Sequence, residues 1–208
     1  MAELIFYTNP QSRGQTVRWM LEEVGAPYDV QYLDYATSLK AEPYLSVNPM
    51  GKIPAIRHGD KVVTEVAAIC CYLADAFPAA NLAPAPENRA AYYRYIFFAS
   101  GPIEAAFSNK AAGWAPSEQL QRMFGYGNFD LATGVLEKLL TGRDYISENR
   151  FTAADLFVGA MVNFMLRFKL LEPTPVFTDY IARVTDREAY RRAVALDEQA
   201  GHELAPTG

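Results

Sequence analysis

The sequence predicts an α/β domain of the order βαβ–ββα, followed by an all-α domain. Over the first 78 residues, short apolar runs typical of strands alternate with segments of helical periodicity. Beyond residue 86 only helical periodicity remains, and the proline-rich segment 79–86 separates the two halves. We therefore expect an α/β domain at 1–78, a linker at 79–86 and a helical domain at 87–208.

Composition limits the classes of function. Of the 208 residues, 50% are hydrophobic and 21% are charged, which is typical of a folded globular protein. A net charge of −5 argues against nucleic acid as the main partner, because phosphate binding needs clustered cations. No apolar run approaches the roughly 18 residues of a membrane span, so no membrane partner is expected. Met1–Leu4 lacks the basic start of a signal peptide.

The two cysteines, Cys70 and Cys71, are adjacent. Neighbours on a helix point about 100° apart, which makes a structural disulfide between them unfavourable. They also lack the spacing of a redox dithiol or a zinc site. We expect two reduced cysteines, and hence a cytoplasmic location.

The first twenty-five residues predict a strand, a loop and a helix. The apolar run Leu4–Tyr7 ends at Asn9–Pro10, and Ser12 carries the hydroxyl at the junction. The helix face is formed by Val17, Met20, Leu21 and Val24. Unpaired N–H groups at a helix start attract an anion, and a thiolate is one such anion. Ser12 is either such a site or an ordinary helix cap worth about 1 kcal/mol.

The rest of the first domain reads as strand, hairpin and helix. Tyr28–Leu33 is a second strand, parallel to the first because a helix connects them. Gly59–Asp60 joins two short strands, Ala55–His58 and Lys61–Thr64, and Pro54 stands before them. Apolar residues with helical spacing then form one stripe over 65–77, which predicts a helix.

The second domain is predicted to consist of helices only. Their expected ranges are 87–110 with a kink before Pro102, 117–140, 152–166, 177–184 and 186–198. Thr152 and Asp155 have the spacing of a capping box. The helix after them is apolar on nearly every face, which predicts that it lies at the centre of the domain.

The chain resembles the cytosolic glutathione transferases over nearly its whole length. The resemblance rests on the Tyr7–Arg18 loop and helix start, Asn48–Pro54, Thr64–Ile69 and the Thr152–Asp155 box, in this order and at these spacings. It implies a thioredoxin-like first domain and a helical-bundle second domain, and a homodimer. It also implies glutathione as co-substrate, with no metal.

The resemblance also implies a glutathione site. Pro54 would follow a cis peptide bond, and the backbone of Ile53 would pair with the cysteinyl part of glutathione. Glu65 and Val66 would hold the γ-glutamyl end, although the family has Ser at position 66. Losing that hydroxyl should cost roughly 0.5–1.5 kcal/mol of affinity. Lys52 and Lys40 would offer cations to the glycyl carboxylate, and Asn9 would be an auxiliary.

Two hydroxyls compete for the role of holding the glutathione sulfur. Family members with a tyrosine place it at the end of the first strand, where Tyr7 stands. Members with serine or cysteine use a position five residues later, where Ser12 stands. The loop from Tyr7 to Arg13 is two residues longer than in the tyrosine type, which favours Ser12. Arg13 and Tyr7 remain alternatives.

The implied reaction is attack of the bound thiolate on an electrophile, as in detoxification. An ordinary thiol has a pKa of about 8.5, and lowering it by about 2 units corresponds to roughly 2.7 kcal/mol. A pocket for an apolar electrophile is expected at Phe107, Trp114, Phe124 and Tyr126. The same four residues are equally explained by ordinary helix packing.

Two alternatives remain open. One is a glutathione-dependent isomerase, dehalogenase or disulfide reductase on the same scaffold. A reductase would prefer Cys at position 12, and the maleylacetoacetate isomerase type has a Ser-Ser-Cys-Ser-like loop that Asn9–Ser12 does not match. The other is a binding protein without catalysis, which Val66 favours.

Overall fold

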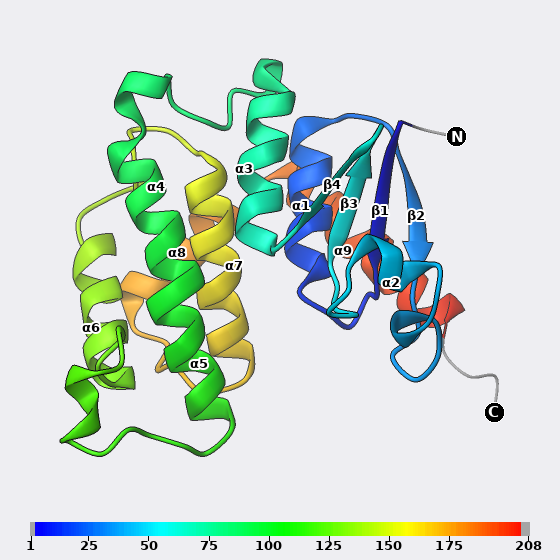
Figure 1. The fold of residues 1–208 in the computed structure, drawn as a ribbon. Helices are drawn as coiled ribbons and strands as arrows, with labels where there is room; N and C mark the ends of the chain where they lie inside the picture. Colours follow the sequence, from blue (N-terminus) through cyan, green and yellow to red (C-terminus); the bar gives the residue numbers. More distant parts are fainter. Residues whose placement is uncertain (1–2, 205–208) are drawn as a thin grey trace. The chain divides into compact units, whose positions relative to one another are not determined.

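The computed structural model describes residues 3–204 (Figure 1). Residues 1–2 and 205–208 of the predicted domains lie outside this range, and with them the first half of Met1–Leu4, the segment that lacks a basic start. The chain forms two compact units, one from residues up to Leu82 together with those from Arg187 onward, the other from Ala83–Asp186. Among the described residues, no helix is both long enough and apolar enough to cross a membrane.

A four-stranded sheet forms the centre of the first unit. Its strands are β1 (Leu4–Thr8), β2 (Tyr28–Tyr32), β3 (Ala55–His58) and β4 (Lys61–Thr64), in the spatial order β2–β1–β3–β4. β1 and β2 are parallel, whereas β3 is antiparallel to both β1 and β4. The predicted parallel pair and the predicted hairpin are therefore confirmed.

Helices cover both faces of this sheet. α1 (Gly14–Val24) and α3 (Val66–Ala76) pack together on one face, and the short α2 (Tyr44–Val47) lies on the other (Figure 1). Alternation along β1 decides which side chains meet which helix. Phe6 is fully buried on the α1 side, whereas the ring of Tyr7 packs against Tyr44 of α2, 5.5 Å between centroids. The first unit also contains 3₁₀ helices at Ser38–Lys40 and Pro78–Ala80.

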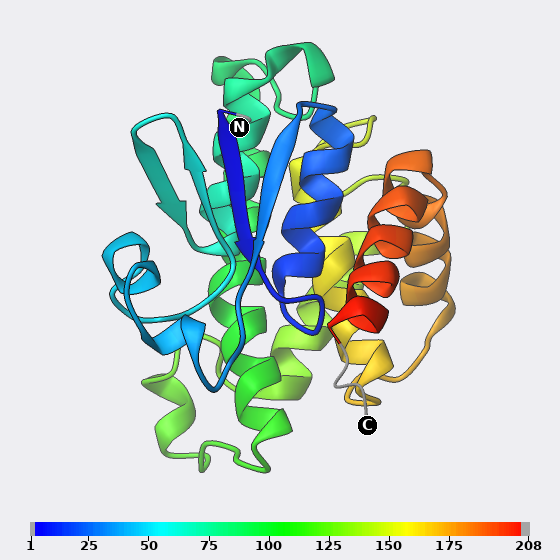
Figure 2. The ribbon, with the colours of Figure 1, turned by 90° about the vertical axis from the view of Figure 1, so that its right-hand side faces the viewer.

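The last helix, α9 (Glu188–Glu203), belongs to the sheet unit and lies along α1 (Figure 2). This differs from the predicted helical domain at 87–208. Arg18 on α1 donates to Asp197 on α9 at 2.7 Å, with both side chains almost fully buried. Arg187 makes two bonds to Glu23 at 2.6 and 2.7 Å. These long-range ion pairs leave no periodic signal in the sequence.

The second unit is helical. Its α-helices are α4 (Arg89–Phe98), α5 (Glu104–Ala111), α6 (Phe129–Leu140), α7 (Ala153–Arg167) and α8 (Pro175–Thr185). A π-helical turn, Ala99–Ile103, joins α4 to α5 and contains Pro102, where the kink was predicted. Short 3₁₀ turns stand at Pro86–Asn88 and Leu120–Arg122.

The centre of the second unit is α7, as its all-round apolar sequence predicts. Residues 153–162 are all buried. The predicted capping box is present: Thr152 accepts from Ala154 N–H, and Asp155 accepts from Thr152 N–H at 3.0 Å. Asp155 also accepts from Ile146 N–H at 2.7 Å and from the Tyr180 hydroxyl at 3.1 Å. The prediction of a helix over 117–140 was wrong in its first half, because Gly127 has a φ of +68° and α6 begins only after Asn128.

Candidate functional site

The register of the sheet brings three predicted segments to one edge. Ala55 stands opposite Tyr7 on one side and opposite Thr64 on the other. The end of β1, the start of β3 and the end of β4 therefore lie side by side. The loop 9–13, the Ile53–Pro54 bond and the start of α3 at Glu65–Val66 continue from these three points. Residues that are far apart in the sequence thus meet at one site.

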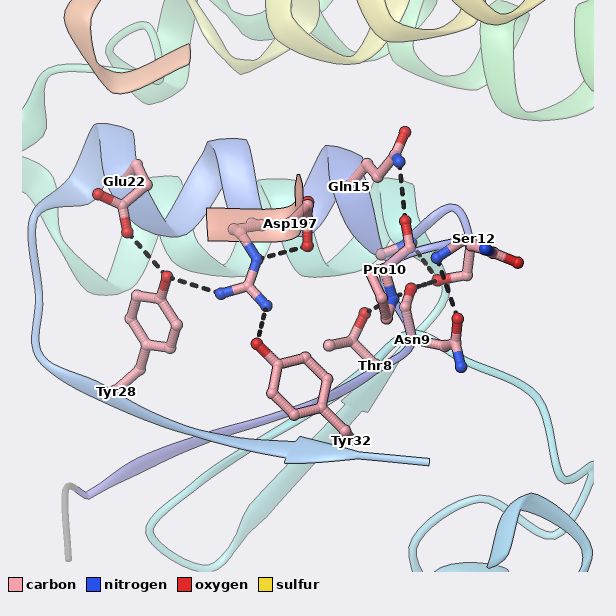
Figure 3. A network of polar contacts seen from close by, with 12 residues as sticks. Thr8, Asn9, Pro10, Ser12, Gln15, Glu22, Tyr28, Tyr32 and Asp197 are labelled. Atoms are coloured by element: carbon pink, nitrogen blue, oxygen red, sulfur yellow. Dashed lines mark hydrogen bonds and ion pairs between the residues drawn. The ribbon is translucent and has the colours of Figure 1, made fainter. Parts of the chain in front are cut away.

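Ser12 links this loop to the start of α1. Its hydroxyl donates to the Asn9 carbonyl at 2.6 Å, and its Oγ accepts from the Gly14 N–H at 2.9 Å (Figure 3). The local interpretation of Ser12 as an ordinary helix cap is corrected, because the N-cap of α1 is Arg13; Ser12 instead pairs the N–H of Gly14 from one residue earlier. Ser12 is half-buried.

Gly14 allows the helix to approach the strand. A Cβ at this position would lie 1.9 Å from Thr8 Oγ1 and 2.8 Å from Ser12 Oγ. Thr8 is fully buried and donates to the Asn9 carbonyl at 3.4 Å. Any larger residue than glycine would push Ser12 or Thr8 away. Neither Thr8 nor Gly14 carries a periodic signal, so sequence reasoning did not identify their importance.

Asn9 has a structural task. Its Nδ2 donates to the Leu33 carbonyl at 3.0 Å, and its Oδ1 accepts from Gln11 N–H at 3.0 Å. Gln15 Nε2 reaches back to the Pro10 carbonyl at 2.8 Å (Figure 3). The Asn9 side chain, predicted as a glutathione contact, therefore holds the loop that presents Ser12.

Tyr35 is a further hydroxyl at this loop that sequence reasoning missed. It is half-exposed and donates to the Gln11 carbonyl at 3.3 Å. Partial burial raises the pKa of its phenol, and the neighbouring Ser12 side chain lowers the pKa in part. The residue follows β2 in a polar segment without periodicity, so only the folded chain places it beside Ser12.

Tyr7 lies on the opposite side of the sheet from α1. It packs against a buried cluster of Leu39, Tyr44 and Ala55. Tyr7 thus lies in an apolar cluster, whereas Ser12 lies in a polar loop.

The Ile53–Pro54 peptide bond is cis, as the family resemblance implies. The chain just before this bond is held at Lys52. The Lys52 carbonyl accepts from the Tyr44 hydroxyl and from Asn48 Nδ2, the latter at 2.8 Å. Burial raises the pKa of Tyr44 to about 12, which keeps this phenol a donor. Ile53 is half-buried and Pro54 is buried.

The two predicted cations differ in their surroundings. Lys40 Nζ donates to the carbonyls of Met50 at 3.1 Å and Gly51 at 2.6 Å, so it secures the 48–52 loop. Lys52 is exposed. Of the two, Lys52 is the one whose side chain is not already used to hold this loop.

Glu65 has the backbone conformation least expected from its residue type. Its φ is +65°, in the left-handed region that a side chain disfavours, at a cost on the order of 1–3 kcal/mol. The residue is exposed and stands immediately before α3, whose first residue is Val66. Backbone strain of this kind concentrates at binding sites.

The four aromatic residues predicted for the second pocket do not form one wall. Phe124 and Tyr126 line a cavity within the helical unit. Trp114 packs on Phe124, with 5.3 Å between ring centroids. Phe107 instead contacts Phe168 and does not line that cavity.

The two adjacent cysteines differ in burial. Cys70 is buried and Cys71 is half-buried, and the described residues contain no disulfide bond between them. Burial raises the pKa of the Cys70 thiol, so this thiol is not a thiolate nucleophile at neutral pH. Within residues 3–204, no three side chains of His, Cys, Asp or Glu gather closely enough to hold a metal ion.

Residues 12–76 match the family described as the N-terminal domain of glutathione S-transferases. Glutathione S-transferase 1 of Schizosaccharomyces pombe is 29% identical to this chain over 157 residues, which are 70% of this chain and 68% of the relative.

Solved structures extend the similarity to both units. A sphingomonad glutathione S-transferase complexed with glutathione has a TM-score of 0.73 and 25% identity, covering 93% of this chain and 98% of the other. A glutathione transferase homolog from Sulfitobacter with bound glutathione has a TM-score of 0.74 and 25% identity, covering 97% and 99%.

Proposed function

We propose, from the premise that the chain belongs to the cytosolic glutathione transferase family, that it binds glutathione and transfers its thiol to an apolar electrophile. The observation that carries this proposal is the meeting of the Ser12 loop, the cis Ile53–Pro54 bond and the strained Glu65 at one sheet edge. Each of these features binds a different part of the tripeptide.

The tripeptide lies in an extended form along this edge. The Ile53 backbone pairs with the cysteinyl unit, as one strand adds to another. Glu65 and the N–H of Val66 hold the γ-glutamyl end, where the start of α3 favours the carboxylate. Lys52 serves the glycyl carboxylate. The sulfur is then directed toward Ser12.

Ser12 stabilises the thiolate by redirecting its hydroxyl proton from the Asn9 carbonyl to the sulfur. In the free protein this proton is donated to the Asn9 carbonyl at 2.6 Å, a neutral bond worth about 0.5–1.5 kcal/mol. A bond to a thiolate is worth about 1.5–3 kcal/mol because its acceptor is charged. The exchange therefore favours the thiolate, and Oγ keeps its bond from Gly14 N–H throughout. The Tyr35 hydroxyl, which follows β2 and donates to the Gln11 carbonyl, is a second donor beside the Ser12 loop.

The reaction forms one bond and breaks another. The thiolate sulfur adds to an electrophilic carbon, and a leaving group such as chloride departs with the electron pair of its bond. Ser12 is a hydrogen-bond donor in this step and is not itself the nucleophile. Addition without a leaving group, as in an isomerisation, would need the same thiolate.

Two measurements test the proposal. The chain should be retained on immobilised glutathione and should conjugate 1-chloro-2,4-dinitrobenzene, followed by absorbance. Glu65→Ala should weaken retention, whereas Glu118→Ala, an exposed acid in the helical unit, should not. Retention without conjugation would favour a binding protein. No retention at all would refute the glutathione site.

Location and assembly are part of the same proposal. Similarity to the glutathione transferases supports a cytoplasmic homodimer. Tyr93 and Phe97 on α4 are 40% and 65% exposed, which is the apolar surface that a partner protomer would cover. Light scattering after gel filtration should give twice the chain mass of 23.1 kDa, and a monomer would contradict the proposed dimer.

A further inference from the structure

A cavity of about 350 Å³ lies within the helical unit. Its wall comes from α4, the π-helical turn, the segment 121–127 and α6, so every lining residue belongs to Ala83–Asp186. We call it the helical-unit cavity. It is formed without any residue of the sheet unit, and what it binds need not depend on glutathione.

Two unusual backbone features shape the helical-unit cavity. Pro102 cannot donate a helical hydrogen bond and its ring conflicts with the carbonyl of residue 98, so the chain makes a π-helical turn there. Phe98 and Pro102 both line the cavity. On the other side, Gly127 has a φ of +68°, and a Cβ there would lie 2.8 Å from Leu131. π-Helical turns of this kind are frequent at functional sites.

The chemistry of the wall is apolar with hydrogen-bond donors. No residue lining the helical-unit cavity is charged, and Phe98, Phe124 and Tyr126 contribute aromatic rings. Gln121 Oε1 accepts from Asn128 Nδ2 at 2.9 Å, which leaves the Gln121 NH₂ group as donor.

Tyr126 offers a second donor. The Tyr126 oxygen accepts from Asn109 Nδ2 at 2.8 Å, which leaves its O–H for donation. The oxygens of Gln121 and Tyr126 therefore each accept a hydrogen bond already, and both side chains have a donor for a ligand.

We propose that the helical-unit cavity binds an uncharged planar aromatic molecule that carries a hydrogen-bond acceptor, such as a nitro, carbonyl or ether oxygen. A cavity of roughly 150 Å³ holds one benzene, so this volume has room for a substituted ring or two fused rings. Charged ligands are disfavoured because the wall offers no counter-ion. The inference goes beyond the proposed glutathione reaction and stands on the helical unit alone.

The chain carries its own reporter for this site. Trp114 packs on Phe124, which lines the cavity, and Phe124 lies 6.0 Å from Tyr126 between ring centroids. The chain has two tryptophans, and the other, Trp19, is 2% exposed in the sheet unit. Contact quenching by a bound nitroaromatic should therefore be a property of Trp114.

The test titrates the full chain with 4-nitroanisole, without glutathione, and records tryptophan fluorescence. Quenching should saturate, and Trp114→Phe should abolish the saturating part. 4-Nitrobenzoate, an anion of similar size, should bind at least tenfold more weakly. Because Trp114 is partly exposed, quenching by simple collision would rise linearly with concentration. Linear quenching would overturn the proposal.

Two variants and a matched control locate the ligand. Val135→Phe places a ring in the helical-unit cavity and should weaken binding at least tenfold. Gln121→Glu keeps the oxygen that accepts from Asn128 but replaces the donor with an acceptor, and should also weaken binding at least tenfold. Val194→Phe makes the same change on α9, in the other unit, and should leave binding within twofold.

Thermal unfolding of each variant shows that it is folded. Equal affinities for Val135→Phe and Val194→Phe would refute the site, and an unchanged Gln121→Glu would refute the acceptor requirement. Retention on immobilised glutathione tests the proposed function separately, because none of the residues proposed to bind glutathione lies in the helical unit.

Discussion

A single hydroxyl, that of Ser12, connects helix capping with the proposed chemistry. Ser12→Ala should cut the conjugation rate by up to about 100-fold near pH 6.5, because roughly 2.7 kcal/mol of thiolate stabilisation is lost. KM for glutathione should change little. The kinetic pKa should rise toward the ordinary thiol value of about 8.5, so the two rates should converge near pH 9.

Ser12→Thr, which retains a hydroxyl, is the control and should preserve most of the rate. If Ser12→Ala keeps the full rate at pH 6.5, the role passes to another donor of the loop. Tyr35→Phe and Tyr7→Phe would then be measured side by side. Tyr35 is favoured over Tyr7 there, because its hydroxyl bonds to Gln11 whereas Tyr7 lies in an apolar cluster.

Gly14 predicts a second effect at the scale of one residue. Gly14→Ala should destabilise the chain by about 1–3 kcal/mol, as overpacking does, because the new Cβ meets Thr8 Oγ1 at 1.9 Å. Gly134→Ala, inside α6 where a Cβ meets open space, should instead stabilise by about 0.5–1 kcal/mol. Urea denaturation measures both.

Thr8→Ala should partly restore the stability of Gly14→Ala, because it removes the oxygen that the new Cβ meets. Failure of this double variant to recover any stability would show that the cost arises elsewhere in the loop.

At the scale of secondary-structure elements, the start of α7 depends on one buried carboxylate. Asp155 receives the N–H groups of Thr152 and Ile146 and the hydroxyls of Thr152 and Tyr180. Asp155→Asn turns an NH₂ toward these donors and should cost about 3–5 kcal/mol of unfolding free energy. Asp130→Asn, an exposed acid in the first turn of α6, should change it by less than about 0.5 kcal/mol. A loss below about 1 kcal/mol for Asp155→Asn would contradict this account.

Elements were predictable where local signals determine them. The capping box at Thr152 and the hairpin turn at Gly59–Asp60 each lie within a few residues, and both are present. The start of α6 was misplaced because Gly127 ends any helix at a left-handed φ that the sequence does not display. The segment 121–127, which was predicted to be helical, instead lines a cavity.

The site was predictable only in part, for a physical reason. Ile53, Pro54, Glu65 and Ser12 stand in recognisable short motifs, and the register then brings their segments together. Tyr35 joins them only through the folded loop. Lys40 and Asn9 have the right chemistry by residue type, but their side chains are used to hold neighbouring loops. Residue type alone cannot distinguish these two uses.

At the scale of the whole molecule, one buried ion pair joins two helices that are far apart in the sequence. Arg18 and Asp197 are 179 residues apart, and Arg18 also meets the hydroxyls of Tyr28 and Tyr32 (Figure 3). Asp197→Ala should destabilise the chain by about 3–5 kcal/mol, because a buried guanidinium loses its counter-ion. Chemical denaturation followed by circular dichroism measures the loss.

The double variant Arg18→Met with Asp197→Leu should regain most of that loss, since apolar groups can replace a buried pair. Arg192→Met, which removes an ion pair to Glu22 from a more exposed arginine, serves as the control and should cost less than about 1 kcal/mol. A double variant as unstable as Asp197→Ala alone would contradict the argument.

The placement of α9 on α1 has a consequence for synthesis. A ribosome delivers the strands and first helices of the sheet unit early, but Glu188–Glu203 follow only after the whole helical unit. Domains usually mature in the order of translation, yet this sheet unit cannot bury Arg18 against Asp197 until the intervening helical unit has been synthesised. The sheet edge proposed to bind glutathione is therefore formed before its unit is complete, and the helical unit, which is continuous in sequence, can fold before the sheet unit does.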